Sequence, residues 1–357
     1  MKSFVTAALL FTCASAAHAQ TQNKLPVADR VKIISLSADT GKNLELPPVS
    51  VSGIRVIPIC SDTSRLGFVE VGAMGKLVSG VTDKPWQQYL QDFVDAQYKS
   101  VFKDTGVQLL WIVHELRISE GMIPSRAYVQ LKATVYMSAG QDQYRLLTIF
   151  DRTIAKRGGG IKNKHDDNIA DILRLLFKES SAQAAGKPSD EWSPQTLAGV
   201  LATEQQRFQA PILTSPGYTH GVYTTYKQFL DNAPAIDSFK VKQNIFGKLL
   251  VYAIGADSSR LIENPWGLCM NGKIYKCQGD ALVPLERYGQ GFAISGYINA
   301  HNEESKDRLM DALDGIATGR VVVSPHKGVF PVTANPYITN GCPEATRMDL
   351  ETGELAF

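Results

Sequence analysis

The sequence lacks the features that mark several common classes of protein. Its 37 basic and 35 acidic residues nearly cancel, which argues against nucleic acid or an anionic membrane as the main partner. No stretch after the first twenty residues reaches the roughly eighteen consecutive apolar residues that a membrane-spanning helix needs. Only four cysteines follow that stretch, too few to be the main scaffold of a chain this long. We therefore expect a soluble protein, and the length suggests two domains.

Catalytic and metal-binding motifs are also missing. His114-Glu115 resembles the start of a zinc-protease motif, but Ile118 stands where the second histidine would be. His114 shares strand parity with Ile112 and Leu116, which predicts a partly buried histidine with its hydrogen bonds satisfied. No serine lies in a G-x-S-x-G pattern. The sequence therefore predicts no catalytic residue, no metal ligand and no cofactor, although catalytic triads are defined by geometry and can escape a sequence search.

The first twenty residues, MKSFVTAALLFTCASAAHAQ, have the organisation of a secretory signal peptide. Lys2 precedes an apolar run, and small residues end at Ala19, where we expect cleavage. Acylation at Cys13 would need a small residue before it, but Thr12 and Phe11 stand there. The pattern predicts a signal peptide over residues 1–19 and an exported protein, either periplasmic or extracellular.

The rest of the chain predicts an α+β protein. After a linker over residues 20–47, residues 48–186 alternate strands and helices in a way that favours an antiparallel sheet with helices on one face. A change of apolar phase at Gly53 predicts a β-bulge. Apolar residues at spacings of three and four predict two amphipathic helices, which carry Trp86, Tyr89, Leu90, Phe93 and Val94 in the first and Ile169, Ile172, Leu173, Leu176 and Phe177 in the second.

The second half divides into a connector and a β-rich domain. Residues 187–243 predict a helical connector, with one helix after Ser193-Pro194 and another over residues 221–234. Residues 244–357 show short strands separated by glycine and aspartate, which predicts a small β-meander or barrel. A charged helix is expected over residues 303–317.

The stretch ENPWGLCMNGKIYKC, residues 263–277, predicts a two-residue hairpin turn at Asn271-Gly272. In that register Cys269 faces Ile274, and Cys277 lies on the opposite face of the hairpin. The two cysteines are also offset by about 10 Å along the strands, too far for a disulfide. If the protein is oxidised, the partner must be Cys60 or Cys342; otherwise the thiols are small core residues, the interpretation that we favour.

Part of this second half resembles a known family. GVYTTYKQFLDNAPAI, WGLCMNGKIYKC and LVPLERYGQGFAISGY together resemble a family of uncharacterised exported proteins of Gram-negative bacteria, in which GVY, F-x-x-N-x-P and W-G-x-C-x-x-G-K-x-Y follow in this order. The resemblance covers roughly residues 220–300 and implies no activity. Met270 stands where that family often has an acidic residue. The first half resembles, in pattern only, α/β domains of periplasmic lipoproteins that assist envelope transport or assembly.

A glycine-rich basic loop, AKRGGGIKNKHDDN, suggests an anion site, because backbone N–H groups in such loops can approach a phosphate. Its spacing does not fit a P-loop, and aspartates at the following helix start would compete for the positive helix end. A solvated loop is the favoured interpretation. The residues that would form the anion site are Lys156, Arg157, Gly158, Gly159, Gly160 and Lys162.

The sequence favours a binding protein over an enzyme. Tyrosine and tryptophan gather in the second half and combine apolar area with a hydrogen-bonding group, as interfaces require; equally, they could form the core of a small β-domain. The candidate contact residues are Tyr223, Tyr226, Trp266, Tyr275 and Tyr288. The expected partner is another envelope protein, with oligomeric state left open. The alternative is a hydrolase or other enzyme whose site lies between the two domains.

Overall fold

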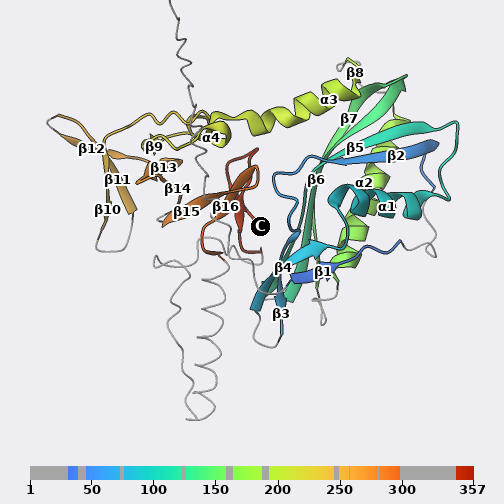
Figure 1. The fold of residues 1–357 in the computed structure, drawn as a ribbon, viewed down its shortest axis with the longest axis horizontal. Helices are drawn as coiled ribbons and strands as arrows, with labels where there is room; N and C mark the ends of the chain where they lie inside the picture. The colour runs from blue at the N-terminus through green and yellow to red at the C-terminus, as the bar shows by residue number, and fades with distance from the viewer. Residues whose placement is uncertain are drawn as a thin grey trace, which may run out of the picture.

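The computed structural model describes residues 31–38, 46–72, 76–122, 125–157, 164–186, 193–244, 249–256, 258–279, 281–297 and 343–357. It is a mixed α+β structure, with far more strand than helix, arranged in sheets of eight, seven and three strands (Figure 1). The predicted signal peptide, residues 158–163 of the glycine-rich loop, the helix expected over 303–317 and Cys342 lie outside the described residues. Of the helices in the described ranges, none has the length and apolar character to cross a membrane.

The N-terminal sheet is built around three long strands that curl together (Figure 1). Its order is β1-β4-β3-β5-β6-β7-β8, with β2 also beside β5. The bounds are β1 Val31–Ile34, β2 Val51–Pro58, β3 Gly67–Val71, β4 Lys76–Thr82, β5 Val107–Met122, β6 Ser125–Gly140, β7 Gln143–Arg157 and β8 Gln195–Thr196.

The pairing in this sheet is mixed, whereas the sequence pattern predicts an antiparallel sheet. β2 and β3 both pair with β5 in parallel, one after the other along its length, while β6 and β7 are antiparallel neighbours. Parallel pairing requires a crossover. Helix α1, Trp86–Tyr98, is part of that connection, because it returns the chain before β5 begins. The bulge predicted at Gly53 is confirmed by a shift in the β2–β5 register between Val51 and Gly53.

One face of this sheet, called the inner face here, carries the main hydrophobic core. Helices α1 and α2, His165–Ala185, both pack on it, and the two predicted apolar stripes are confirmed as buried. The facing strand residues include Trp111, Val113, Leu131 and Val135, all with no exposed surface. Burial of this apolar area stabilises the fold by about 25 cal/mol per Å².

The opposite, outer face is only partly covered. Helix α3, Leu197–Gln205, packs through Val200 on Leu110 and Ile112 of β5, and a short 3-10 helix, η2, continues over Gln206–Gln209. Thr196 caps α3 by accepting a hydrogen bond from the Gly199 backbone N–H. α3 runs along the top of the view in Figure 1, from the N-terminal sheet toward the C-terminal strands.

The C-terminal strands follow the predicted meander. The seven-stranded sheet has the order β18-β17-β16-β15-β14-β13-β9, so neighbours from β13 to β18 are consecutive in the chain. A separate three-stranded sheet contains β10, β11 and β12. The bounds are β9 Gly221–Tyr223, β10 Phe239–Gln243, β11 Leu249–Ile254, β12 Ser259–Ile262, β13 Gly267–Met270, β14 Lys273–Gln278, β15 Ala281–Tyr288, β16 Gly291–Ile294, β17 Arg347–Met348 and β18 Leu355–Ala356.

The helix predicted over residues 221–234 is wrong over most of its length. Residues 221–223 form β9, which pairs with β13, and only α5, Tyr226–Leu230, is α-helical. Val222 and Tyr223 are buried on opposite faces of that sheet, which a strand achieves with adjacent residues. Gly221 has a φ of 147°, and a Cβ there would clash with the backbone of Ile236, so glycine is required where β9 begins. A second short helix, α4, spans Pro211–Thr214.

The hairpin predicted at Asn271-Gly272 is confirmed. Both residues have positive φ, 53° and 72°, and Cys269 pairs with Ile274 as expected. Cys269 lies in the core under one face of the C-terminal sheet, while Cys277 packs with the cluster on the other. Among the cysteines in the described ranges, Cys60, Cys269 and Cys277 are all free thiols. Burial raises the pKa of Cys60 and of Cys277 to about 12, so both remain protonated at neutral pH.

Candidate functional site

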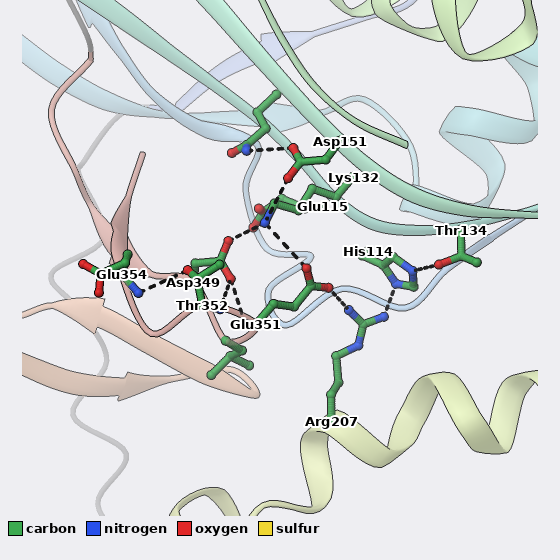
Figure 2. A network of polar contacts seen from close by, with 12 residues as sticks. His114, Glu115, Lys132, Thr134, Asp151, Arg207, Asp349, Glu351, Thr352 and Glu354 are labelled. Carbon is green, nitrogen blue, oxygen red and sulfur yellow. Dashed lines mark hydrogen bonds and ion pairs between the residues drawn. The ribbon is translucent and has the colours of Figure 1, made fainter. Parts of the chain in front are cut away.

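Charged side chains gather where the outer face of the N-terminal sheet meets the last strands of the chain. Lys132 of β6 donates a short hydrogen bond to Asp349, which follows β17 (Figure 2). Arg347 of β17 forms an ion pair with Glu115 of β5. These four residues are called the ionic cluster here. All four are largely buried, and their side chains come from three strands and a turn. The cluster holds the two sheets together.

A β-bulge in β5 directs two neighbouring side chains to this cluster. The β5–β6 register shifts between Val113 and Glu115, so His114 has no partner residue on β6. The bulge places both His114 and Glu115 on the outer face. The predicted parity is therefore half correct: His114 shares the outer face with Ile112, whereas Leu116 lies in the inner core.

The predicted satisfied state of His114 is confirmed. Its Nε2 lies 2.6 Å from Thr134 Oγ1, and its Nδ1 is in short contact with the Arg207 guanidinium. A guanidinium can only donate, so Nδ1 accepts and the proton resides on Nε2, which donates to Thr134. Burial, with Arg207 and Lys132 nearby, lowers the pKa of His114 to about 3. A neutral imidazole protonated on Nε2 cannot take the Thr134 proton, so this pair is not a nucleophile and its base.

The charges of the ionic cluster are fixed by one another. Burial acts to lower the pKa of Lys132, but the hydrogen bond and charge of Asp349 outweigh it and the pKa is raised. For Asp349, burial acts to raise the pKa, and Lys132 together with the backbone N–H groups of Glu351 and Thr352 lowers it. Those N–H groups donate to Asp349 Oδ1 over 2.7 and 3.1 Å. Both side chains are therefore charged at neutral pH.

A cleft of about 350 Å³ opens beside the cluster, between the outer face of β6 and β7 and helix α3. The exposed charges at the cleft are carboxylates: the side chains of Asp151 and Glu351 are 52% and 49% exposed, whereas that of Lys132 is 9% exposed. No group of histidine, cysteine and acidic side chains in the described ranges is arranged to hold a metal ion. The lining residues are His114, Lys132, Ala133, Thr134, Ile149, Phe150, Asp151, Thr203, Glu204, Arg207 and Glu351.

The cleft lies next to an open strand edge. β8 pairs with β7 only at Gln143 and Tyr144, and within the described ranges no other strand pairs on that side of β7. Pro194 directly precedes β8 and has no N–H, so β8 cannot extend further along β7. Ile149, in the unpaired part of β7, is 71% exposed on the outer face and lines the cleft.

The inner side of β7 is covered by helix α2. Arg152 forms an ion pair with Glu179 of α2 at 3.2 Å, and Lys156 pairs with Asp171 of the same helix. Of the anion-loop candidates, Lys156 and Arg157 thus lie at the end of β7 rather than in a loop. Gly158, Gly159, Gly160 and Lys162 lie outside the described residues.

The structure divides the five aromatic candidates. Tyr223 and Trp266 are buried in the C-terminal core and pack around Phe229, so they present little or no surface to a partner. Tyr226 is half-buried and donates to the Leu350 carbonyl over 2.6 Å. Tyr275 is half-buried on the other side of the hairpin.

Tyr288 joins the two sheets. Its hydroxyl lies 2.7 Å from Ser64 Oγ, and the guanidinium of Arg65 sits 4.2 Å from the centre of its ring. Arg65 is also 4.5 Å from the ring centre of Phe68 and 3.5 Å from Asp62. Tyr288 therefore serves a contact within this chain.

Most residues of the site could not be recognised from the sequence. Lys132, Thr134 and Asp151 stand at alternate positions of amphipathic strands, where polar residues are ordinarily solvated. Asp349 lies 217 residues beyond Lys132, and Glu351 follows it. One signal was available: His114 and Glu115 follow a run of five apolar residues in β5, and adjacent polar residues at a change of phase are typical of a bulge.

Comparisons with known proteins give little guidance. No family model matches the chain, and no curated protein matches it. A solved structure from Xanthomonas campestris, described under the family model DUF330, is 16% identical, with 50% of this chain and 99% of that one covered and a TM-score of 0.27. Another, described only as an uncharacterized protein, is 16% identical, with 44% and 97% covered and a TM-score of 0.22. TM-scores this low carry no functional argument.

Proposed function

We propose that this chain is an exported, non-enzymatic binding protein of the cell envelope that takes up an extended segment of another envelope protein by strand addition to β7. Export rests on the signal-peptide pattern of residues 1–19 and on the resemblance of residues 220–300 to exported proteins. In this proposal an α/β domain and a β-rich domain, joined by the connector, form one platform for the partner.

The observation that carries the proposal is the unpaired stretch of β7 beside the cleft. A strand edge presents unpaired N–H and C=O groups that another strand can bind, while a neighbouring pocket selects alternate side chains. β8 of the same chain already pairs with one end of this edge, which shows that the backbone of β7 is able to bind a further strand there. The remaining stretch offers twelve backbone positions, residues 146–157, described as strand in the structure.

The two basic residues of β7 that form ion pairs with α2 do not protect its outer side. Proteins commonly block an open edge with lysine or arginine. Here Arg152 and Lys156 are turned to the inner side, where Glu179 and Asp171 of α2 hold them. On the outer side stands Ile149, an apolar residue at 71% exposure. An incoming segment would cover it and the cleft together.

Binding to a defined peptide tests the proposal. The probe is a seven-residue peptide of alternating threonine and valine with lysine at its centre, titrated into the full-length mature chain by calorimetry. Two further versions carry N-methyl groups on the odd or on the even amides. Because a bound strand turns only alternate amides toward its neighbour, one methylated version should bind as well as the parent and the other should not bind.

Hydrogen exchange and a matched pair of variants locate the site. We expect the peptide to slow exchange of amides in residues 146–157. Ile149→Thr should weaken binding about fivefold through lost apolar contact. Leu261→Thr is the control, because Leu261 is also exposed, at 43%, on an edge strand of the three-stranded sheet. Absence of binding, or equal binding of both methylated peptides, would overturn the proposal.

A further inference from the structure

We infer that the cleft beside β7 selects a lysine or arginine side chain in the segment added to that strand. This inference rests on the proposed function and specifies the chemistry of its ligand. Its starting point is the arrangement of charge around the cleft: two carboxylates stand at the opening, and the basic groups lie deeper and already have partners (Figure 2).

The carboxylates of the cleft outnumber its cations. Among the lining side chains, Asp151, Glu204 and Glu351 are acidic, while Lys132 and Arg207 are basic. Lys132 forms an ion pair with Asp349, which is buried and does not line the cleft. The negative charge of Asp349 offsets the positive charge of Lys132, so Lys132 contributes less positive potential inside the cleft. Because His114 is neutral, it does not restore the balance. The cleft therefore carries net negative charge and favours a cation.

The two exposed carboxylates retain capacity to accept hydrogen bonds. Asp151 Oδ2 lies 3.5 Å from Lys132 Nζ, and Glu351 Oε2 lies 3.7 Å from the same atom. Both separations exceed the usual length of an N–H···O hydrogen bond. The other oxygen of Glu351 accepts from Arg207 over 3.1 Å, and that of Asp151 from Gln130 over 3.3 Å. An ammonium or guanidinium group could thus bind both carboxylates without displacing a short hydrogen bond.

The strand geometry brings a side chain to this place. Ile149 and Asp151 are two residues apart on β7, so both point to the outer face, opposite Thr134 and Lys132 of β6. A residue added beside them with its side chain on the same face would lay an aliphatic stem along Ile149 and extend its charged end toward Asp151 and Glu351. Lysine and arginine combine such a stem with a terminal cation. A glutamate in the same position would meet like charge.

Peptides that differ only at the centre test the preference. The lysine peptide described above is compared with versions that carry leucine or glutamate there. We expect binding of the lysine peptide to be at least about tenfold tighter than that of either. The preference should shrink in 0.5 M salt, because Asp151 and Glu351 are half exposed and screening acts on them.

Variants assign the preference to the two carboxylates. The double substitution Asp151→Asn with Glu351→Gln should remove most of the tenfold preference for the lysine peptide over the leucine peptide. Asp92→Asn is the matched control, since Asp92 of α1 is similarly exposed, at 46%, and ion-paired with Lys84. Equal binding of all three peptides, or a preference that survives in the double variant, overturns the inference and leaves the proposed function standing. Absence of binding by every peptide overturns both.

Discussion

The two faces of the β5–β6–β7 sheet are built from the same strands and differ in almost every other respect. The inner face carries Trp111, Val113, Leu131 and Val135, is covered by two helices and contains no exposed side chain among these four. The outer face carries the ionic cluster, a neutral histidine and the exposed Ile149, and it is covered in part by α3 and the last strands. Residues one position apart thus serve stability on one side and, in the proposed function, recognition on the other.

The two faces stabilise the fold through different interactions. The inner face depends on apolar area and close packing, so its stability changes little with pH or salt. The outer face depends on charges that stabilise one another only while all of them are present. Four substitutions, taken from the largest expected effect to the smallest, test that division.

Lys132→Met should lower the free energy of unfolding by about 3 to 5 kcal/mol, because it leaves the buried Asp349 carboxylate without its partner. Adding Asp349→Asn should restore most of that loss, since the amide carries no charge and its oxygen still accepts from the Glu351 and Thr352 N–H groups. Urea unfolding of the single and double variants measures both. A double variant no more stable than the single one would show that the pair is not the source of the effect.

Leu173→Ala should lower the free energy of unfolding by about 2 to 5 kcal/mol, since Leu173 of α2 is fully buried on the inner face and its removal opens a cavity. Unlike the loss at Lys132, this one should be the same at low and high salt. Gln183→Ala, at an exposed position of the same helix, is the control and should change stability by less than about 0.5 kcal/mol. Thermal unfolding at two ionic strengths measures the loss. A loss that depends on salt would contradict the expected difference between the two faces.

The pH dependence of stability should include a contribution from His114. Its pKa in the folded protein is lowered from 6.5 to about 3, so the unfolded chain binds a proton that the folded protein does not. Stability from this group is present above pH 6.5 and is lost as the pH falls toward 3; about 2 kcal/mol should disappear between pH 7 and pH 5. His114→Asn should remove that part of the slope in denaturant unfolding. An unchanged slope would place the acid sensitivity elsewhere.

Ile149→Thr should change the free energy of unfolding by less than about 0.5 kcal/mol, because the side chain is mostly in solvent. The same substitution should weaken peptide binding, as proposed above. Calorimetry and thermal unfolding on one preparation separate the two effects. A marked loss of stability would mean that Ile149 belongs to the packing of the fold and not to a contact surface.

The sequence predicted best what depends on local periodicity. Three kinds of feature follow from residues that are close together in the sequence, and all are confirmed: the apolar stripes of α1 and α2, the Gly53 bulge and the Asn271-Gly272 hairpin. The helix expected over 221–234 failed because its apolar spacing suited a helix while β13, more than forty residues later, pairs with its first three residues. Tertiary pairing outweighed local preference there.

The candidate site could not be predicted in the same way. In the sequence, Lys132 indicates only that one face of β6 is polar. The residues near it do not indicate that Asp349 packs against it in the fold. The aromatic residues were ambiguous for a related reason: Tyr223 and Trp266 have the composition of an interface, but the sheet folds them onto Phe229. Composition indicates what a residue can do, and long-range packing decides where it does it.

The ionic cluster also constrains how the chain reaches its folded state. Lys132 and Asp349 are separated by 217 residues, so their contact closes a very long loop. Loop closure of that length is costly in entropy and comes after contacts that are near in sequence. The β5–β6–β7 meander and the β13–β14 hairpin can form from neighbouring residues, whereas the junction between the two sheets must wait for strands that are already in place. Refolding should therefore show fast formation of sheet followed by a slower docking phase, and Lys132→Met should speed unfolding more than it slows folding.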